Sequence, residues 1–438
     1  MRQPTATLLA LTLLCLAAAS AEVPARPALH IPPGAQAGAD FDAAAATNAW
    51  LATYSGEKRA RSDAYFEGGY WLILWDFLYG SAVFLLLLAS GLSGRMRDLA
   101  ERTTRFCPLQ TFLYWVQFAV ALWCLGLPLS IYEGFLRERQ YGLMNQSFAA
   151  WFGDELKSLA LLAALGGLAM MALFGVVRRL PRTWHVWGAV LTMCLLAIGM
   201  LIGPVFIAPM FNRYTPLEDP KIVPPILSLA RASGIPATRV YQVDASRQSN
   251  RVSANVSGFL GTERITLNDN LLNRCSPEEI LSVMGHEMGH YVLGHVYKGL
   301  LFFLVVVTVF FALLRRALDW SLASWGRRWK IRGVGDVAII PLAALWLGLF
   351  GFVFTPIDNS FIRGQEYEAD LYGINAARQP DGEAQVDVML GEYRKLDPTP
   401  LEEFLFYDHP SGRTRIHAAM RWKAENQCLA EPARACGK

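Results

Sequence analysis

The chain has 438 residues, of which 53% are hydrophobic and 18% are charged, and its formal net charge is +3. This composition is too apolar for an ordinary soluble domain. The small net charge, and the absence of a basic stripe interleaved with aromatic residues, give no indication of a nucleic-acid partner. The seven cysteines are scattered without a CxxC pair, which argues against a zinc site built from thiolates.

The N-terminus predicts a secretory signal peptide over residues 1–21. Arg2 supplies a positive charge, a short apolar run follows, and residues 19–21 read Ala-Ser-Ala, a small-residue cleavage site. An uncleaved signal anchor is the alternative. Residues 22–68 are rich in Ala and Pro and then become polar, so we expect a loosely structured extension with room for one helix.

Six long apolar segments predict membrane-spanning helices, because crossing a bilayer takes about 20 apolar residues. The segments are residues 71–91, 112–132, 159–177, 186–207, 299–314 and 337–354. Their number and length argue against buried helices of a large soluble protein. Four spans thus fall within residues 69–207, and two fall within residues 299–356.

The basic residues of the short connections predict the orientation, because cytoplasmic loops are enriched in Lys and Arg. Arginines and lysines gather after the first, third and fifth spans, around residues 95–105, 178–182 and 315–332. We therefore expect these three loops in the cytoplasm. Residues 208–298 and 357–438 would then lie on the opposite side, together with the mature N-terminus.

Two pairs of residues add weaker indications. Cys428 and Cys436 are close together near the C-terminus and would form a disulfide in an oxidising outer compartment, although two free thiols are nearly as plausible. Asp76 and Gln117 lie inside predicted spans, where polar groups line a wet cavity or bond to a neighbouring helix. We favour the second role for Gln117.

Residues 286–290 read His-Glu-Met-Gly-His, which is a His-Glu-x-x-His motif. On a helix, positions i and i+4 share one face, so His286 and His290 can direct both imidazoles at one metal ion. Glu287 can then reach a water on that ion and act as a general base. The helix is predicted to begin at Ser276, an N-cap residue that precedes a proline and two acids. Two helix histidines without a metal are the alternative.

A catalytic zinc needs a third protein ligand, and Glu366 is the best candidate because it follows the last span on the same side as the motif. On a helix, Glu366 and Asp370 share a face, whereas Glu368 lies about 200° away from Glu366. We expect Asp370 to accept the second N–H of a ligating histidine. Arg363 is expected to pair with one of these acids. An ordinary solvated acidic helix is the alternative.

The helix that carries the motif is expected to continue into the fifth span. On one continuous helix, His295 lies about 140° from His290 and about 180° from His286. It would then face away from the metal, so we expect a structural role for it.

Residues 208–276 predict a small α/β unit in front of the motif. A helix is expected within residues 219–233, and short strands are expected at residues 239–243 and 264–267. A strand close to the metal could hold an extended peptide through backbone hydrogen bonds.

With these motifs in order, the chain resembles the type I CAAX prenyl endopeptidases, which are polytopic zinc metalloproteases with a helical HExxH and a downstream ExxxD. The resemblance covers roughly residues 205–420. It is carried by His-Glu-Met-Gly-His at 286–290 with Gly-His at 294–295, Arg-x-x-Glu-Tyr-Glu-Ala-Asp at 363–370, His-Pro-Ser-Gly-Arg-Thr-Arg-Ile at 409–416 and Arg-Ile-Thr-Leu-Asn-Asp-Asn-Leu-Leu at 264–272. It implies that one Zn²⁺ ion is bound by His286, His290 and Glu366.

The resemblance also implies roles for four further residues. Glu287 would be the base that activates water, and Asp370 would support a zinc ligand from behind. His409 and Arg415 would contact the developing oxyanion or the substrate carbonyl, where a donor or cation stabilises the transition state.

The predicted fold is therefore mainly α: a polytopic helical bundle of about six spans plus a signal peptide, with a zinc metalloprotease domain that carries a small β-sheet. That domain is divided between residues 208–298 and 357–438. The predicted function is a zinc metalloendopeptidase that acts on polypeptides, for example in envelope quality control. The predicted location is a bacterial inner membrane, with the site facing the periplasm. A prenylated cytosolic protein would not reach such a site, so only the peptidase chemistry is carried over.

Two alternatives remain at this stage. An intramembrane site-2-type protease should carry its motif within an apolar span, whereas His286 precedes the fifth span by about a dozen residues. A non-catalytic membrane scaffold or chaperone with a structural zinc would not need the base Glu287.

Overall fold

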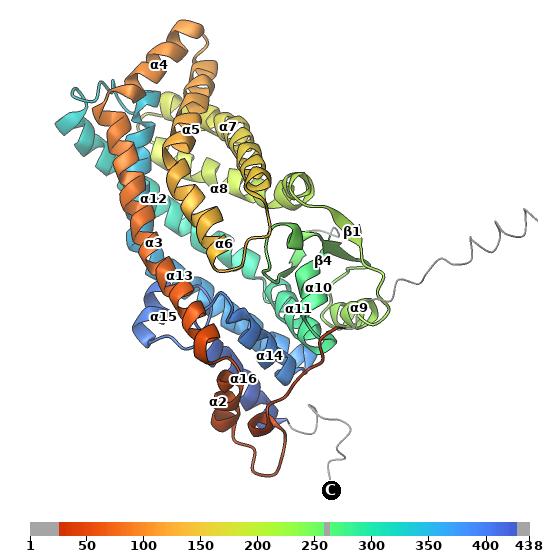
Figure 1. The fold of residues 1–438 in the computed structure, drawn as a ribbon. Coiled ribbons are helices and arrows are strands. Elements are labelled where there is room, and N and C mark those ends of the chain that lie inside the picture. Colours follow the sequence, from red (N-terminus) through yellow and green to blue (C-terminus); the bar gives the residue numbers. More distant parts are fainter. Residues whose placement is uncertain (1–25, 258–262, 427–438) are drawn as a thin grey trace, which may run out of the picture.

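A computed structural model describes residues 26–257 and 263–426. The predicted signal peptide and the predicted Cys428–Cys436 pair lie outside the described residues, so both stay predictions. Figure 1 shows an elongated molecule, with a bundle of long helices in its upper part and a small sheet with shorter helices below it.

Among the described residues, six helices are long and apolar enough to cross a membrane, which confirms the predicted number of spans. They are α3 (Gly56–Ala89), α5 (Cys107–Ile131) with its continuation to Gln140, α7 (Phe148–Arg179), α8 (Trp184–Ile202) with its continuation to Met210, α12 (His295–Trp325) and α13 (Ile340–Ala377). The 38 residues of α13 include both the sixth span and the segment that carries Glu366. One continuous helix therefore connects the membrane bundle to the site.

The three basic connections lie at the same end of the bundle. Arg97, in α4 (Leu92–Thr103), donates to Asp336 Oδ2 at 2.7 Å. Arg178 donates to the carbonyl of Gly335 at 3.0 Å, and Arg315 donates to the carbonyl of Arg182. The loops after the first, third and fifth spans are therefore on one side of the bundle, as the predicted orientation requires.

Polar residues inside the bundle have the two kinds of environment considered from the sequence. Gln117 of α5 donates to the carbonyl of Met96 in α4 at 3.2 Å, so it bonds a neighbouring helix as favoured. Asp76 of α3 instead lines a cavity between the helices.

Four short strands form one sheet with the order β1-β2-β4-β3. They are β1 (Tyr214–Pro216), β2 (Val240–Val243), β3 (Ala254–Ser257) and β4 (Arg264–Asn268). β2 and β4 are parallel, and the other two pairs are antiparallel. The two expected strands correspond to β2 and β4, and the expected helix is α9 (Val223–Ala232). β3 lies at the edge of the sheet, on the side of the catalytic helix α11 (Pro277–Val292).

The N-terminal extension is packed from residue 33 onward, so the expectation of a loose segment was wrong there. It contains α2 (Ala43–Ala52), whose Trp50 and Leu51 are buried in one cluster with Ile416 of α16 (Gly412–Glu425). The buried Nζ of Lys423 also bonds Asp381 Oδ2 at 2.6 Å. Apolar burial and one buried ion pair therefore tie the second half of the metalloprotease domain together, and α2 closes over it.

Candidate metal and active site

The helix α11 begins as its sequence predicts. Ser276 is the N-cap, its side chain accepts from the backbone N–H of Glu279, and the Glu279 side chain accepts from the backbone of Ser276 in return. Buried Ile280, Met284 and Met288 pack into the core beneath the sheet. The histidine face of the same helix is thereby directed toward α13.

Glycines allow α11 and α13 to cross at very short distance. A Cβ on Gly285 would lie 2.9 Å from the carbonyl oxygen of Gly373, and a Cβ on Gly373 would lie 2.6 Å from the backbone nitrogen of His286. Gly289 faces Ala369 in the same way, and a Cβ on Gly289 would lie 3.0 Å from the carbonyl oxygen of Ala369. Because these glycines have no side chain, the backbones of α11 and α13 come close enough for the polar side chains of the neighbouring residues on the two helices to meet.

At this crossing the structure brings together the three predicted ligands. The Nε2 atoms of His286 and His290 are 3.0 Å apart. Oxygens of Glu366 lie 3.3 Å from His286 Nε2 and 3.4 Å from His290 Nε2. All three residues offer a ligand atom within 4.8 Å of the others, and this is the only such group among the described residues.

These distances fit a metal ion. Ligands at about 2.0–2.1 Å in a tetrahedral zinc site are about 3.3–3.4 Å from one another. Two imidazoles and one carboxylate with these separations therefore match a catalytic set of three protein ligands with an open fourth position.

Asp370 lies behind His286, as predicted. Its Oδ1 is 2.7 Å from His286 Nδ1, and its side chain is fully buried. Arg415 donates to both oxygens of Asp370, at 2.6 and 3.0 Å. The arginine in turn neutralises the carboxylate that orients the histidine.

The contacts of Arg415 differ from those implied by the resemblance. Its guanidinium also lies 3.3 Å from Glu383 and 3.0 Å from Asp387, both in α14 (Pro380–Leu390). Burial lowers the pKa of Arg415, but Asp370, Asp387 and Glu383 together hold it well above its usual range. Arg415 also lines the cleft, and its contact with Asp370 links it to His286. Sequence reasoning missed Glu383 and Asp387, although their i, i+4 spacing was visible.

Arg363 is not paired with the acids of its own helix, so that prediction was wrong. Within the described chain it makes no ion pair with Glu366 or Asp370, and it donates to the carbonyls of Glu403 and Tyr407, at 2.7 and 2.5 Å. Those carbonyls are at the end of α15 (Pro400–Phe406). Arg363 therefore holds the turn that leads to His409.

His409 is placed at the metal site by that turn. Its Nε2 lies 3.3 Å from Glu366 Oε2, and its Nδ1 lies 2.8 Å from Asp408. Its place beside the ligands agrees with the role that the resemblance implies.

His295 is not in the ligand group, but the expectation that the motif helix continues unbroken into the fifth span was wrong, and so was the angle counted for His295. The helix α11 ends at Val292, and Gly294 has the left-handed φ of 66° before α12 begins at His295. The chain turns there, and His295 Nδ1 comes within 2.8 Å of His290 Nδ1. The signal was Gly294 itself, since glycine adopts the left-handed conformation without steric cost and commonly ends helices.

Glu287 and the ligands open onto a cavity of about 350 Å³. Its wall also includes Val252, Ser253 and Ala254, the segment that leads into edge strand β3. Among the residues that the structure describes, no side chain hydrogen-bonds the Glu287 carboxylate. Burial raises the pKa of Glu287, which brings it closer to the neutral range in which a general base works best.

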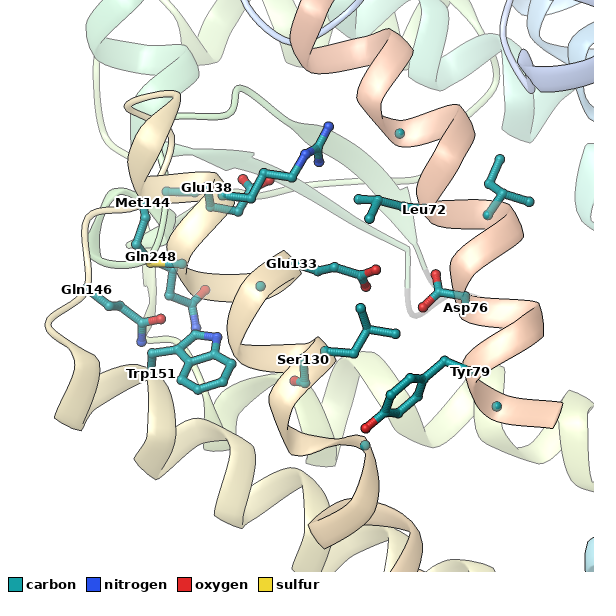
Figure 2. Close-up of a pocket in the computed structure, with 18 of the residues that line it drawn as sticks. Leu72, Asp76, Tyr79, Ser130, Glu133, Glu138, Met144, Gln146, Trp151 and Gln248 are labelled. Atoms are coloured by element: carbon teal, nitrogen blue, oxygen red, sulfur yellow. The ribbon is translucent and has the colours of Figure 1, made fainter. Parts of the chain in front are cut away.

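A second, larger cavity of about 820 Å³ lies between α3, α5 and the start of α7. Figure 2 shows Asp76 and Glu133 directed toward each other across it. Arg251 lines both cavities and pairs with Glu138 Oε2 at 2.7 Å. The two cavities are therefore neighbours, and Arg251 is part of the wall of each.

Comparison with known proteins gives the family. The model for peptidase family M48 matches residues 216–423, and the model for the CAAX prenyl protease N-terminal region, with five membrane helices, matches residues 46–213. An uncharacterized metalloprotease, YhfN, of Bacillus subtilis is 30% identical over 339 residues, which cover 77% of this chain and 79% of that protein. The chain belongs to peptidase family M48.

Other M48 relatives agree with this assignment. CAAX prenyl protease 1 of Saccharomyces cerevisiae is 28% identical over 309 residues, which cover 67% of this chain and 68% of the relative. The crystal structure of S. mikatae Ste24p has the same fold, with a TM-score of 0.65 over 86% of both chains at 22% identity.

The resemblance inferred from the motifs is thus confirmed, and the chain is an integral membrane metalloprotease that hydrolyses peptide bonds. The scaffold and site-2-type alternatives are not favoured.

Proposed function

We propose that this M48 protease is a zinc endopeptidase whose single ion is held by His286, His290 and Glu366. The observation that carries the proposal is the close approach of the three side chains: the two Nε2 atoms are 3.0 Å apart, and each lies 3.3–3.4 Å from one of the two Glu366 oxygens, beside Glu287 at the wall of the cleft. A bound zinc ion supplies Lewis-acid activation of a water and of the scissile carbonyl.

The residues of the chain move the protons. Glu287 accepts a proton from the attacking water and returns it to the nitrogen of the leaving amine. With both ring nitrogens protonated, His409 donates from Nδ1 to Asp408 and from Nε2 to the oxyanion as it develops. Asp370 and Arg415 keep His286 oriented while charge moves at the site.

We propose that the substrate binds as an extended polypeptide along β3. That strand is one of the two edge strands of the sheet, and the residues that precede it line the cleft with the ligands. An edge strand offers unpaired backbone groups to a peptide. The cavity among the membrane helices shares Arg251 with the cleft, so a membrane-associated chain that enters between the helices would come close to the same place.

The catalytic proposal is tested with Glu287→Gln beside the wild-type protein in detergent, with casein as an unfolded substrate. Removing a general base should lower cleavage by about 10²–10⁴-fold while zinc content stays at one ion per chain. Equal cleavage by the two proteins would refute the assignment of Glu287.

We propose further that the protein lies in a bacterial inner membrane with its site in the periplasm. The support is the clustering of the basic loops at the end of the bundle opposite the metal site. Single cysteines introduced at exposed Arg332 and exposed Arg421, in a background whose seven native cysteines are replaced by serine, test the orientation with a membrane-impermeant thiol reagent on intact spheroplasts. Labelling at Arg421→Cys alone is expected, and labelling at Arg332→Cys alone would reverse the orientation.

The orientation also decides the substrate class. Relatives are named CAAX prenyl proteases, but a site in the periplasm would be closed to prenylated cytosolic proteins. We therefore propose misfolded or membrane-associated envelope polypeptides as substrates. Cleavage restricted to a prenylated peptide, with none of its unmodified counterpart or of casein, would contradict this proposal.

A further inference from the structure

The turn at Gly294 creates a chain of polar contacts that leads from one ligand to the protein surface. His290 Nδ1 lies 2.8 Å from His295 Nδ1, and His295 Nε2 lies 3.2 Å from Glu368 Oε2. Lys298 Nζ donates to the same Glu368 oxygen at 2.5 Å. The His295 side chain is only 4% exposed, whereas the side chains of Glu368 and Lys298 are about half exposed, at 52% and 46%.

The chemistry of these atoms determines where each proton lies. His290 presents Nε2 to Glu366 and His286, so Nε2 is the atom that would bind the ion. A neutral imidazole that binds metal through Nε2 carries its proton on Nδ1. Within residues 26–257 and 263–426, the contact that satisfies this N–H is His295 Nδ1, which must therefore be the unprotonated acceptor.

The rest of the chain agrees with that assignment. If His295 accepts at Nδ1, its own proton is on Nε2, and it faces the carboxylate of Glu368, which accepts it. Lys298 balances the charge of Glu368 at the surface. Each of the three contacts, from His290 to His295, from His295 to Glu368 and from Lys298 to Glu368, thus pairs a donor with an acceptor.

We propose that His295 is a positioning residue that fixes the tautomer and ring orientation of the zinc ligand His290, with Glu368 fixing His295 in turn. The inference rests on the proposed zinc site and extends it to a residue outside the HExxH and ExxxD motifs. The two ligating histidines are held differently. His286 is held by a buried carboxylate under Arg415, whereas His290 is held by a neutral ring whose partner reaches the surface.

Two substitutions of His295 separate hydrogen bonding from packing. Asparagine places its Oδ1 near the position of the histidine Nδ1 and keeps an acceptor for His290. Glutamine places its amide near the position of Nε2, so it keeps the contact with Glu368 and removes the acceptor. Glutamine is also the closer match to histidine in volume. If His295 acts only by packing, the glutamine variant should keep more of the zinc affinity; if His295 acts as proposed, the asparagine variant should keep more of it.

The measurement is the dissociation constant for Zn²⁺ of the full chain in detergent, from competition with a chelator of known affinity. Loss of a residue that orients a ligand typically costs 10–100-fold in metal affinity. We expect that loss in His295→Gln and in His295→Ala, and we expect His295→Asn to stay within a few-fold of wild type. The thermal unfolding midpoint of each metal-free variant serves as the folding control.

Several results would overturn the proposal. They are unchanged zinc affinity in the glutamine variant, or a glutamine variant that binds zinc as well as or better than the asparagine variant. If the asparagine variant does not fold, undiminished affinity in the glutamine variant still decides against the role. The readout is independent of proteolysis, so its failure is distinguishable from failure of the proposed function, which is measured by casein cleavage with Glu287→Gln.

Discussion

The close crossing of α11 and α13 makes a sharp prediction for Gly373→Ala. The added Cβ would lie 2.6 Å from the backbone nitrogen of His286, whereas carbon contacts are relaxed only at about 3.5–4.0 Å. The atoms nearest to this Cβ belong to the backbone of Gly285 and His286, so no side chain can rotate away to make room. The two helices must therefore separate by about 1 Å. Overpacking of this kind costs about 1–3 kcal/mol.

The same separation acts on the metal. Glu366 is on α13 and the two histidines are on α11. The separations between the Glu366 oxygens and the histidine Nε2 atoms match those between the ligands of a zinc ion within a few tenths of an ångström. A metal site tolerates deviations of only about 0.2 Å in its ligand distances. Gly373→Ala should therefore lower zinc affinity as well as the thermal unfolding midpoint.

Gly364→Ala is the matched control because Gly364 is in the same helix and has open space around the position of a Cβ. Alanine there should stabilise the helix by up to about 1 kcal/mol through propensity alone. Both variants are measured by thermal unfolding in detergent and by chelator competition for zinc. If Gly373→Ala matched Gly364→Ala in both measurements, the argument from close helix approach would be refuted.

Three further outcomes are expected from other parts of the structure. Burial lowers the pKa of His286, but hydrogen bonds to its two carboxylate partners outweigh that effect and raise the pKa to about 10 in the metal-free protein. Below that pH, zinc must displace a proton to bind, so zinc affinity should rise by up to about tenfold per pH unit from pH 6 to 8. A zinc affinity that does not change with pH would contradict this. Lys423→Ala removes the fully buried cation of the ion pair with Asp381 and should destabilise the protein by about 3–5 kcal/mol in chemical unfolding, whereas Arg421→Ala on the exposed face of the same helix should change stability by less than about 0.5 kcal/mol. Arg363→Gln should reduce casein cleavage by about 10–100-fold through displacement of His409 while zinc content stays at one per chain, and loss of zinc instead would mean that Arg363 acts on the ligands directly.

Local sequence signals were sufficient where one segment determines its own structure. The six spans follow from apolar length, and the start of α11 follows from the N-cap at Ser276. The third ligand, Glu366, was found because helical periodicity and the side of the membrane limited the candidates. β1 and β3, of three and four residues, exist only through pairing with β2 and β4, so no pattern within them was long enough to predict them.

The predictions that failed depend on contacts between distant segments. Arg363 could not be assigned from its own helix, because its partners are carbonyls 40 and 44 residues away at the end of α15. The carboxylates around Arg415 were missed for the same reason, because α14, which supplies Glu383 and Asp387, was not recognised as part of the site.

The error at His295 has a different origin, because it depends on one residue of backbone. Angles counted along a continuous helix place His295 on the far side from the metal, and the count is valid only if Gly294 is helical. With Gly294 in the left-handed region, the rotation restarts and the ring returns to His290. The same turn separates the catalytic helix from the fifth span, so α11 can be placed by its glycine contacts with α13 while α12 is placed by the membrane bundle. A helix running unbroken from Pro277 into the membrane could not meet both requirements and also bring a second-ring partner to His290.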